Sequence, residues 1–301
     1  MTDVTVSIVN HENRDAVLES LAALTHDPGR RATVELIVVD NASTDGSVAA
    51  IRAARPEVEV VARTDRAGYG ANHNRALAQA TGRHVLVLND DAVVQPGAVD
   101  ALVDHLDRHP DVAVACPTVR TADGRVEVTL WPRPGLRLDV AGALRPGRPP
   151  QARGAAGIGW ATGCALMVRR DALDQVGGFD EGYFMYSEEV DLCVRLVDAG
   201  HRIASVPEAV VVHEGQVSTG VLSPERAVEM ARSRRRYWRR HYAPAARVAA
   251  QVVVGAQFAS LAAVAAVRRR PARPFVLQAI GSFRDPRGGG LRERAEAFNR
   301  S

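Results

Sequence analysis

The chain has 301 residues, of which 46% are hydrophobic and 24% are charged, and its formal net charge is +3. A chain of this length and composition buries a sizeable core, and these proportions exclude a disordered, collagen-like or repeat-built protein. The charge is unevenly distributed, because residues 226–301 hold 17 arginines and 4 acidic residues, whereas acidic residues are in excess before them. This distribution predicts two electrostatically different parts that meet near residue 225.

The cysteines indicate a reducing compartment. Cys116, Cys164 and Cys193 lie far apart and form no CxxC pair, so we expect neither a disulfide framework nor a thiolate zinc site. No basic segment followed by an apolar one precedes the first strand-like run, so we expect no signal peptide. No stretch before residue 244 is apolar enough to span a bilayer.

Strand and helix patterns alternate over the first ninety residues. The β-branched apolar runs that predict strands are Val4–Val9, Val34–Val39, Val58–Ala62 and His84–Leu88. The helical patterns between them are Arg14–Leu24, Gly46–Arg55 and Gly70–Ala80. This α/β series predicts a mainly parallel sheet with helices on both faces. Polar clusters at Asn10–Asn13, Asp40–Asp45 and Asn89–Asp91 follow strands, where such sheets bind ligands.

The next part of the chain is less regular. A helix at Ala98–His109 and a strand at Val112–Ala115 precede Pro132–Gly159, whose Pro, Gly and Arg content predicts a long loop. Regular structure resumes in the segments Ala161–Val168, Asp171–Val176 (helix), Val190–Ala199 (helix), Ile203–Val206 (strand) and Ala209–His213 (β run). We expect the first unit to end near Thr219.

The basic C-terminal part is predicted to be helical. Glu225–Tyr242 is an arginine-rich helix, and the Ala/Val-rich run Val248–Val267 is followed by Arg268–Arg270. The run is long enough to span a membrane, but Gln251 and Gln257 interrupt it and alanine contributes little to insertion. Three interpretations remain open: a buried or oligomer-forming helix, an interfacial helix held by flanking arginines, or a transmembrane helix.

The strand that ends in Asn89-Asp90-Asp91 is the most informative motif. Two adjacent carboxylates repel unless a cation or hydrogen-bond donors offset them, and Mg²⁺ or Mn²⁺ prefers such oxygen ligands. The alternative is that the two aspartates simply begin a turn. His213 ends a second β run and is a candidate to complete a metal site, although a lone histidine is usually structural.

Two further acidic motifs have alternative interpretations. Asp40 ends a strand and is a candidate for nucleotide contact, whereas we expect Asp45 to cap a helix. Glu188 and Glu189 stand at a predicted helix start, where the helix dipole favours acidic residues. The functional alternative is that one of the two is a general base in a cleft.

A glycine pair opens the third predicted helix. Gly68 and Gly70 lie between Arg66 and Arg75, an arrangement suited to the approach of a phosphate or nucleotide. The segment lacks a third glycine and does not open the first βα unit, so it is not a dinucleotide-binding fingerprint.

The order of these motifs resembles the inverting glycosyltransferases of family 2, which have the GT-A fold, and most closely their bacterial rhamnosyltransferase-like branch. The resemblance runs from Val4 to Ser218. The segments that carry it are Val9-Asn10, VDNASTDGS at 39–47, GYGANHNRAL at 68–77, LNDD at 88–91, WATG at 160–163, GGFDE at 177–181, YSEEVDLCVR at 186–195, and His213.

The resemblance implies roles for the matching positions. Asp91 stands at the final acid of the metal-binding DXD region, and because Asn89 replaces its first Asp, metal affinity rests more heavily on Asp91 and His213. Glu188-Glu189 matches a Glu-Asp pair whose second acid is the usual base, which implies Glu189 but leaves Glu188 as an alternative. The donor-binding positions that it implies are Val9, Asn10, Asp40, Asn41, Arg66, Gly68, Asn74, Asn89 and Asp90. The acceptor-side positions are Trp160, Gly163 and Asp191.

The resemblance also implies an activity and a domain organisation. We expect a catalytic domain at 1–220, with a nucleotide-sugar half at about 1–116 and an acceptor half at about 117–220, and an extension at 221–301. The expected reaction uses Mg²⁺ or Mn²⁺ to transfer L-rhamnose from dTDP-rhamnose to a hydroxyl of a lipid-linked or cell-surface glycan. A natural-product acceptor is the alternative. The expected location is cytoplasmic, peripheral on the inner face of the plasma membrane.

Two other classes of protein fit less well. A nucleotidyltransferase would carry a glycine- and lysine-rich phosphate loop near the first strand, and His11-Glu12-Asn13-Arg14 is unlike one. A nucleic-acid-binding module would use the basic run Arg232–Arg240, with Tyr237 and Trp238 for stacking. The acidic first part would repel a polyanion, so we expect no nucleic-acid partner.

Overall fold

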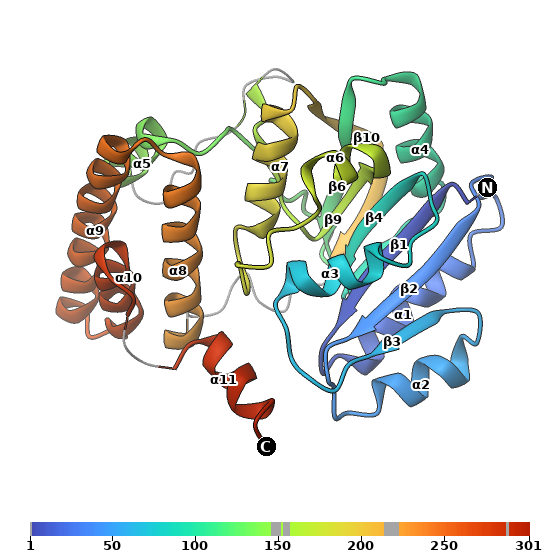
Figure 1. Ribbon diagram of the computed structural model, residues 1–301, viewed down its shortest axis with the longest axis horizontal. Coiled ribbons are helices and arrows are strands. Elements are labelled where there is room, and N and C mark those ends of the chain that lie inside the picture. Colours follow the sequence, from blue (N-terminus) through green and yellow to red (C-terminus); the bar gives the residue numbers. More distant parts are fainter. Residues whose placement is uncertain (1, 146–151, 153–156, 214–222, 287–288) are drawn as a thin grey trace.

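The computed structural model describes residues 2–145, 152, 157–213, 223–286 and 289–301. An α/β part with one large sheet lies beside a bundle of C-terminal helices (Figure 1). The predicted boundary at residue 220 falls outside the described residues. The arrangement confirms the expected fold class, including the helical C-terminal extension.

Eight strands form the large sheet, in the order β3-β2-β1-β4-β9-β6-β10-β5. Four parallel strands form one half: β1 (Val4–Asn10), β2 (Val34–Asp40), β3 (Glu59–Ala62) and β4 (His84–Asn89). The other half contains β5 (Ala92–Val94), β6 (Val112–Thr121), β9 (Ala165–Arg169) and β10 (Arg202–His213). There β10 is parallel to β6, whereas β9 and β5 run antiparallel to their neighbours.

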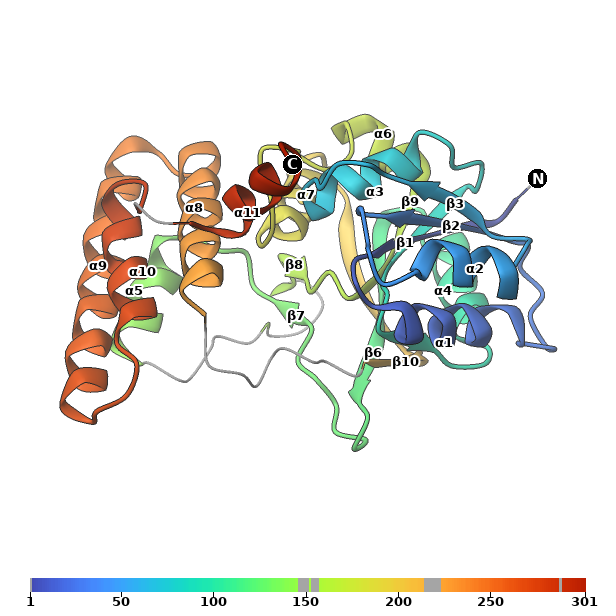
Figure 2. The same cartoon turned by 90° about the horizontal axis from the view of Figure 1, so that it is seen from below.

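Helices cover both faces of this sheet (Figure 2). One face packs against α1 (Arg14–Thr25), α2 (Ser47–Ala54) and α4 (Ala98–Arg108). The other face packs against α3 (Tyr69–Leu77), α6 (Arg170–Val176) and α7 (Glu188–Asp198). The central strands β1 and β4 are therefore buried on both sides, as their continuous apolar sequences require.

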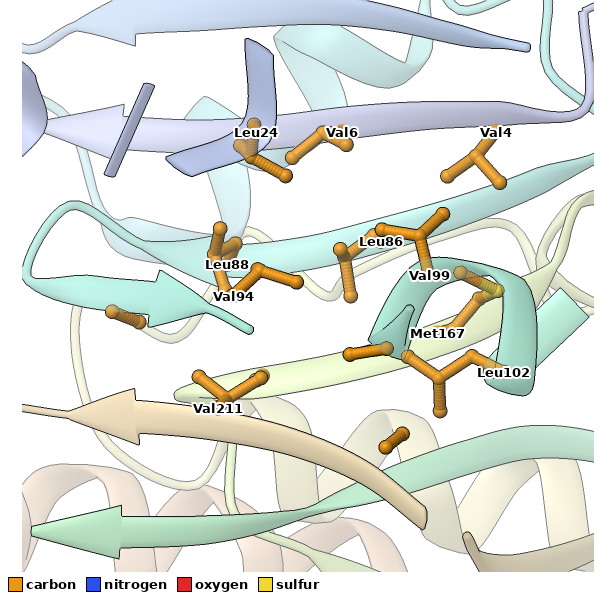
Figure 3. Close-up of a cluster of buried hydrophobic side chains, with 14 of the residues drawn as sticks. Val4, Val6, Leu24, Leu86, Leu88, Val94, Val99, Leu102, Met167 and Val211 are labelled. Atoms are coloured by element: carbon orange, nitrogen blue, oxygen red, sulfur yellow. The ribbon is translucent and has the colours of Figure 1, made fainter. Parts of the chain in front are cut away.

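Alternation along β1 sends its side chains into two different cores. Val4 and Val6 point into the cluster shown in Figure 3, where they meet Leu86 and Leu88 of β4. Ser7 lies on the opposite face, and its hydroxyl is 2.7 Å from Nδ1 of His73 on α3. Burial lowers the pKa of His73 to about 3, so this buried pair is neutral.

The prediction of a structureless loop at 132–159 is wrong in part, because α5 (Leu136–Leu144) forms within it. None of the nine residues of α5 is fully buried by the described chain. The helix instead rests against α9 (Pro244–Val267), where Gln257 donates a hydrogen bond of 3.1 Å to the carbonyl of Gly142. Its stability therefore depends on a segment more than a hundred residues away.

Two short strands flank residues 132–159 and form a small sheet. Two runs that were predicted separately form one continuous strand. In the small sheet, β7 (Leu130–Trp131) pairs with β8 (Trp160–Ala161), which places Trp131 opposite Trp160. The runs predicted at Ile203–Val206 and Ala209–His213 form the single strand β10, with a register shift between Val206 and Val210.

The C-terminal helices are α8 (Pro224–His241), α9, α10 (Arg273–Phe283) and α11 (Leu291–Phe298). Helix α8 joins them to the α/β part, because Tyr237 and Trp238 pack with Tyr183, Val190 and Val194. Among the described residues, α9 alone is long and apolar enough to cross a membrane, with a mean hydropathy of 1.8. Only 28% of its most apolar stretch is buried, which disfavours a core helix.

Candidate active site

The sheet register brings the predicted polar clusters together. Asn10 is paired with Asp40, and Val9 with Asn89, so three strands end at the same edge. A cleft of about 590 Å³ opens there. Its lining consists of Val9, His11, Glu12, Asn13, Asn41, Arg66, Ala67, Tyr69, Asn72, Asn89, Asp90, Asp91, Phe184, Met185, His213, Leu291, Arg294 and Ala295.

Asp91 and His213 meet at the floor of this cleft, because β10 pairs with β5 directly after the aspartate. Oδ1 of Asp91 lies 3.2 Å from Nε2 of His213, and the two side chains are 13% and 12% exposed. The hydrogen bond to Asp91 raises the pKa of His213. Nδ1 of His213 lies 3.7 Å from the carboxylate of Glu127, a neighbour that no sequence motif indicated.

Asp90 and Asn89 complete this edge. Burial, followed by the charge of Asp91, raises the pKa of Asp90 to about 6. The Asp90 carboxylate accepts a hydrogen bond of 3.4 Å from the backbone N–H of His11. Oδ1 of Asn89 accepts a hydrogen bond of 2.9 Å from the hydroxyl of Tyr69.

The donor set suits a metal that is shared with a substrate. No group of three His, Cys, Asp or Glu side chains able to hold an ion occurs in the described part of the chain. Asp91 and His213 offer one carboxylate and one imidazole, and Nδ1 of His213 is buried without a hydrogen-bond partner among the described residues. Mg²⁺ is commonly bound by one or two carboxylates together with substrate phosphates, so these residues fit a metal that a diphosphate helps to hold.

The paired glutamates begin α7 after a strained turn. Tyr186 and Ser187 have φ values of 71° and 68°, a conformation that non-glycine residues rarely adopt and that is often found at functional sites. Burial, followed by the charge of Glu189, raises the pKa of Glu188, and burial also raises the pKa of Glu189. Oε2 of each is buried without a hydrogen-bond partner among the described residues.

Tyr69 links this carboxylate pair to the cleft. Besides its bond to Asn89, its hydroxyl lies 3.1 Å from the carbonyl oxygen of Gly163, a second acceptor for its single proton. A Cβ at Gly163 would lie 3.3 Å from Cβ of Glu189. Burial, followed by the charges of Glu188 and Glu189, raises the pKa of Tyr69 well above its usual value. A chain of contacts through Gly163, Tyr69 and Asn89 therefore connects Glu189 with His213, whose Nε2 lies 3.4 Å from Nδ2 of Asn89.

The profile of glycosyl transferase family 2 matches residues 5–177. The chain belongs to glycosyl transferase family 2. N-acetylglucosaminyl-diphospho-decaprenol L-rhamnosyltransferase of Mycobacterium tuberculosis is 36% identical over 229 residues, which cover 67% of this chain and 72% of that protein. The chain is thus a family 2 glycosyltransferase that is similar to a rhamnosyltransferase, as the sequence motifs predicted.

Solved structures confirm the GT-A fold of this glycosyltransferase. The mannosyltransferase PcManGT of Pyrobaculum calidifontis, in complex with GDP-Man and Mn²⁺, aligns with a TM-score of 0.56 at 21% identity over 93% of this chain and 84% of its own. TarS 1–349 of S. aureus, in complex with UDP-GlcNAc, aligns with a TM-score of 0.56 at 16% identity. The alignment covers 93% of this chain and 90% of the TarS chain.

The structure places the predicted donor residues of the glycosyltransferase in two layers. Val9, Asn41, Arg66, Asn89 and Asp90 line the cleft. Asn10 and Asp40 lie beneath it, are both buried, and are joined by a hydrogen bond of 2.8 Å from Nδ2 to Oδ2.

The second layer orders the loop that follows β2. Oδ1 of Asp40 accepts a hydrogen bond of 2.9 Å from the backbone N–H of Ser43. Asp45 accepts backbone N–H bonds of 3.0 Å from Ser47 and Arg14, at the starts of α2 and α1. The N-cap residues are Gly46 for α2 and Asn13 for α1, so Asp45 supports the first backbone N–H of each helix from outside the predicted N-cap position.

Three expectations around α3 need correction. A Cβ at Gly68 would lie 2.6 Å from the carbonyl oxygen of Phe184, so Gly68 permits close packing against that loop rather than phosphate approach. Asn74 is bonded at 2.9 Å to both the carbonyl and the N–H of Phe179 and holds the 178–181 loop. Arg75 is exposed and is not among the described residues that line the cleft.

The residues predicted to lie on the acceptor side differ in their surroundings. Trp160 stacks on Trp131, with ring centroids 5.8 Å apart, and Gly163 lies against Glu189. The prediction for Asp191 is wrong, because its side chain is fully buried and ion-paired at 2.7 Å to both Arg195 and His241. Asp191 faces α8, away from the cleft, and is a structural residue.

Helix α11 supplies cleft residues that the sequence did not indicate. Leu291, Arg294 and Ala295 line the cleft, and the ring of Phe298 lies 3.9 Å from the guanidinium carbon of Arg66. Asn299 bonds the backbone of Arg66 twice, at 2.6 Å and 3.0 Å. Arg66 and Asn299 are 233 residues apart, so a local sequence pattern could not predict this contact.

Proposed function

We propose that this glycosyltransferase transfers L-rhamnose from dTDP-rhamnose to a hydroxyl of a lipid-linked glycan, with inversion at the anomeric carbon and with the aid of Mg²⁺ or Mn²⁺. The name of the mycobacterial relative supports the sugar and the kind of acceptor. The observation that carries the proposal is the Tyr69 hydroxyl, which bridges Asn89, beside Asp91 and His213, to Gly163, beside Glu189. The residues proposed to bind the donor and those proposed to bind the acceptor are therefore connected through the Tyr69 side chain.

Glu189 and Arg66 have different roles in the proposed reaction. Glu189 takes the proton of the acceptor hydroxyl, whose oxygen forms a bond to the anomeric carbon as the bond from that carbon to the diphosphate oxygen breaks. A raised pKa brings this carboxylate closer to the working pH, which favours general-base catalysis. Arg66 faces the cleft and is placed to offset the negative charge of the departing diphosphate.

Asp91 and His213 would hold the divalent ion. The ion, when bound, supplies Lewis-acid stabilisation of the leaving diphosphate. Asp90 and Asn89 shape the same edge from the neighbouring positions, and the peptide N–H of His11 fixes the Asp90 carboxylate.

A transfer assay tests this proposal. The purified protein is incubated with dTDP-rhamnose, Mn²⁺ and a short-chain N-acetylglucosaminyl diphospho-lipid, and the product is examined by mass spectrometry and NMR. We expect one added deoxyhexose with an inverted anomeric linkage. Transfer to a lipid-free small molecule alone would favour the natural-product acceptor, and transfer of another sugar alone would overturn the donor assignment.

We also propose that the protein binds the inner face of the plasma membrane through α9. The exposed positions of this helix carry no charge and include Val248, Val252, Ala256, Ser260, Val264 and Val267, at spacings of three or four residues. Arg268–Arg270 follow directly, and each arginine near an anionic leaflet contributes about 1 kcal/mol. This favours the interfacial interpretation, which would bring the cleft close to a lipid-linked acceptor.

A further inference from the structure

A second cavity, of about 520 Å³, lies between α8, α11 and residues 180–182. Its walls carry six arginines, five of them from α8 at positions that share one helix face. We call it the arginine cavity, after Arg232, Arg235, Arg236, Arg239, Arg240 and Arg292. It is separate from the donor cleft, and the reaction proposed above does not use it.

Some of these arginines already have partners. Arg232 is ion-paired with Asp285 at 2.7 Å, and Asp180 pairs with Arg236 at 2.7 Å and with Arg240 at 2.6 Å. These pairs fix the walls, because a carboxylate that accepts from two guanidinium groups restrains both of them.

Two arginines remain without an acidic partner. Arg235 and Arg239 form no ion pair with any carboxylate in the described part of the chain. Nε of Arg235 and Nε of Arg292 are buried without a hydrogen-bond partner among the described residues. Burial, followed by the charge of Arg239, lowers the pKa of Arg235. An anion in this cavity would supply acceptors to these donors and relieve the repulsion.

The cavity adjoins the reaction site. Glu229 lines it, and the charge of Glu229 contributes to the raised pKa of Glu188. Ser233, also on its wall, donates a 2.8 Å hydrogen bond to the carbonyl of Met185, which lines the donor cleft. Helix α11 faces both spaces, with Arg292 on the cavity and Leu291 on the cleft.

We propose that the arginine cavity binds the diphosphate group of the lipid-linked acceptor, while the acceptor sugar reaches the Glu188–Glu189 pair. A diphosphate presents several anionic oxygens in a geometry that guanidinium groups match bidentately, and the cavity offers two arginines whose charge is not neutralised. This inference rests on the proposed function, since it assumes an acceptor that carries a diphosphate.

A binding experiment tests the site itself. Inorganic pyrophosphate is titrated calorimetrically in EDTA against Asp91→Ala protein, so that metal-supported binding in the donor cleft is removed. Adding Arg235→Gln with Arg239→Gln is expected to weaken binding about tenfold or more, a loss of about 1.4 kcal/mol. The matched control, Arg52→Gln with Arg108→Gln, removes two exposed arginines from α2 and α4 and should leave the affinity unchanged.

A kinetic experiment tests the assignment to the acceptor. Wild-type protein and the Arg235→Gln/Arg239→Gln variant are compared on an N-acetylglucosaminyl diphospho-lipid and on an alkyl N-acetylglucosaminide without phosphate. We expect KM for the diphosphate acceptor to rise about tenfold or more, while kcat and KM for the donor stay unchanged. KM for the phosphate-free acceptor should be the same in both proteins.

The outcomes separate this inference from the proposed function. Absence of transfer to every acceptor by wild-type protein would contradict the proposed function, whereas the pyrophosphate titration would still decide whether the cavity is an anion site. Equal pyrophosphate affinity in both double variants would overturn the site. Pyrophosphate binding without any change in KM for the diphosphate acceptor would overturn the assignment to the acceptor.

Discussion

Glu189 lies against Gly163, and we propose it as the base. If it removes the acceptor proton, Glu189→Gln should lower kcat by roughly 10²–10⁴-fold, the usual contribution of a positioned base. Glu188→Gln should lower kcat less. KM for the donor should not change in either variant, because both carboxylates lie outside the described cleft lining.

The pH dependence follows from the direction of the shift. Only the ionised carboxylate accepts a proton, and burial raises the pKa of Glu189. The wild-type rate should therefore fall as pH decreases through a value above that of an ordinary glutamate, and this acidic limb should be missing from the residual rate of Glu189→Gln. A larger loss of kcat in Glu188→Gln would transfer the role to that residue.

Asp191 offers a second test at the residue scale, because its buried side chain forms ion pairs and does not line the cleft. Asp191→Ala would leave Arg195 and His241 buried without their carboxylate, and breaking such a pair costs about 3–5 kcal/mol. Denaturant unfolding should show this loss, whereas Asp111→Ala, which removes a half-exposed partner of Arg202, should cost about 0–1 kcal/mol. Unchanged stability with a raised acceptor KM would restore the role first predicted for Asp191.

At the scale of elements, α11 is held over the donor cleft by its last residues. Phe298→Ala with Asn299→Ala removes the ring over Arg66 and two hydrogen bonds to its backbone. We expect the affinity for the nucleotide to fall about tenfold, equivalent to about 1.4 kcal/mol. Arg300→Ala, next in the chain, has no contact with Arg66 among the described residues and serves as the control. Equal nucleotide affinity in both variants would show that α11 does not support the cleft.

The elements differ in how far their own sequence determines them. Strands β1, β2 and β4 are largely buried on both faces and were predicted from their apolar runs. Helix α5 was missed because none of its residues is fully buried and its support comes from α9. The function of Gly68 was misjudged for a similar reason, since the backbone of Phe184, which it approaches, is distant in sequence.

At the scale of the whole molecule, the uneven charge distribution was visible in the sequence, but the ion pairs that it forms between the two parts could not be predicted. Arg236 and Arg240 of the basic part pair with Asp180 of the acidic part. The charge difference therefore helps to attach α8 to the α/β part. The return of α11 to the donor cleft could not be predicted, because it joins residues from opposite ends of the chain.

The exposed face of α9 leads to a prediction for membrane binding. Val252→Glu with Val267→Glu places two charges on exposed positions of this helix, which should reduce the fraction of protein that floats with anionic vesicles several-fold, because charged groups are costly to insert. Val126→Glu with Val128→Glu makes the same change at exposed positions of the α/β part and should have no effect. Equal flotation of both variants would contradict a membrane role for α9.

Asp91 and His213 are proposed to form a metal-assisted nucleotide-sugar site. Calorimetric titration with dTDP, UDP and GDP, each in Mn²⁺ or in EDTA, tests it most directly, with Asp91→Ala as the variant and Asp111→Ala as the control. We expect dTDP to bind in Mn²⁺, and EDTA or Asp91→Ala to weaken this binding about tenfold or more. Binding that is unaffected by EDTA and by Asp91→Ala, or the absence of binding to any of the three nucleotides by folded protein, would contradict it.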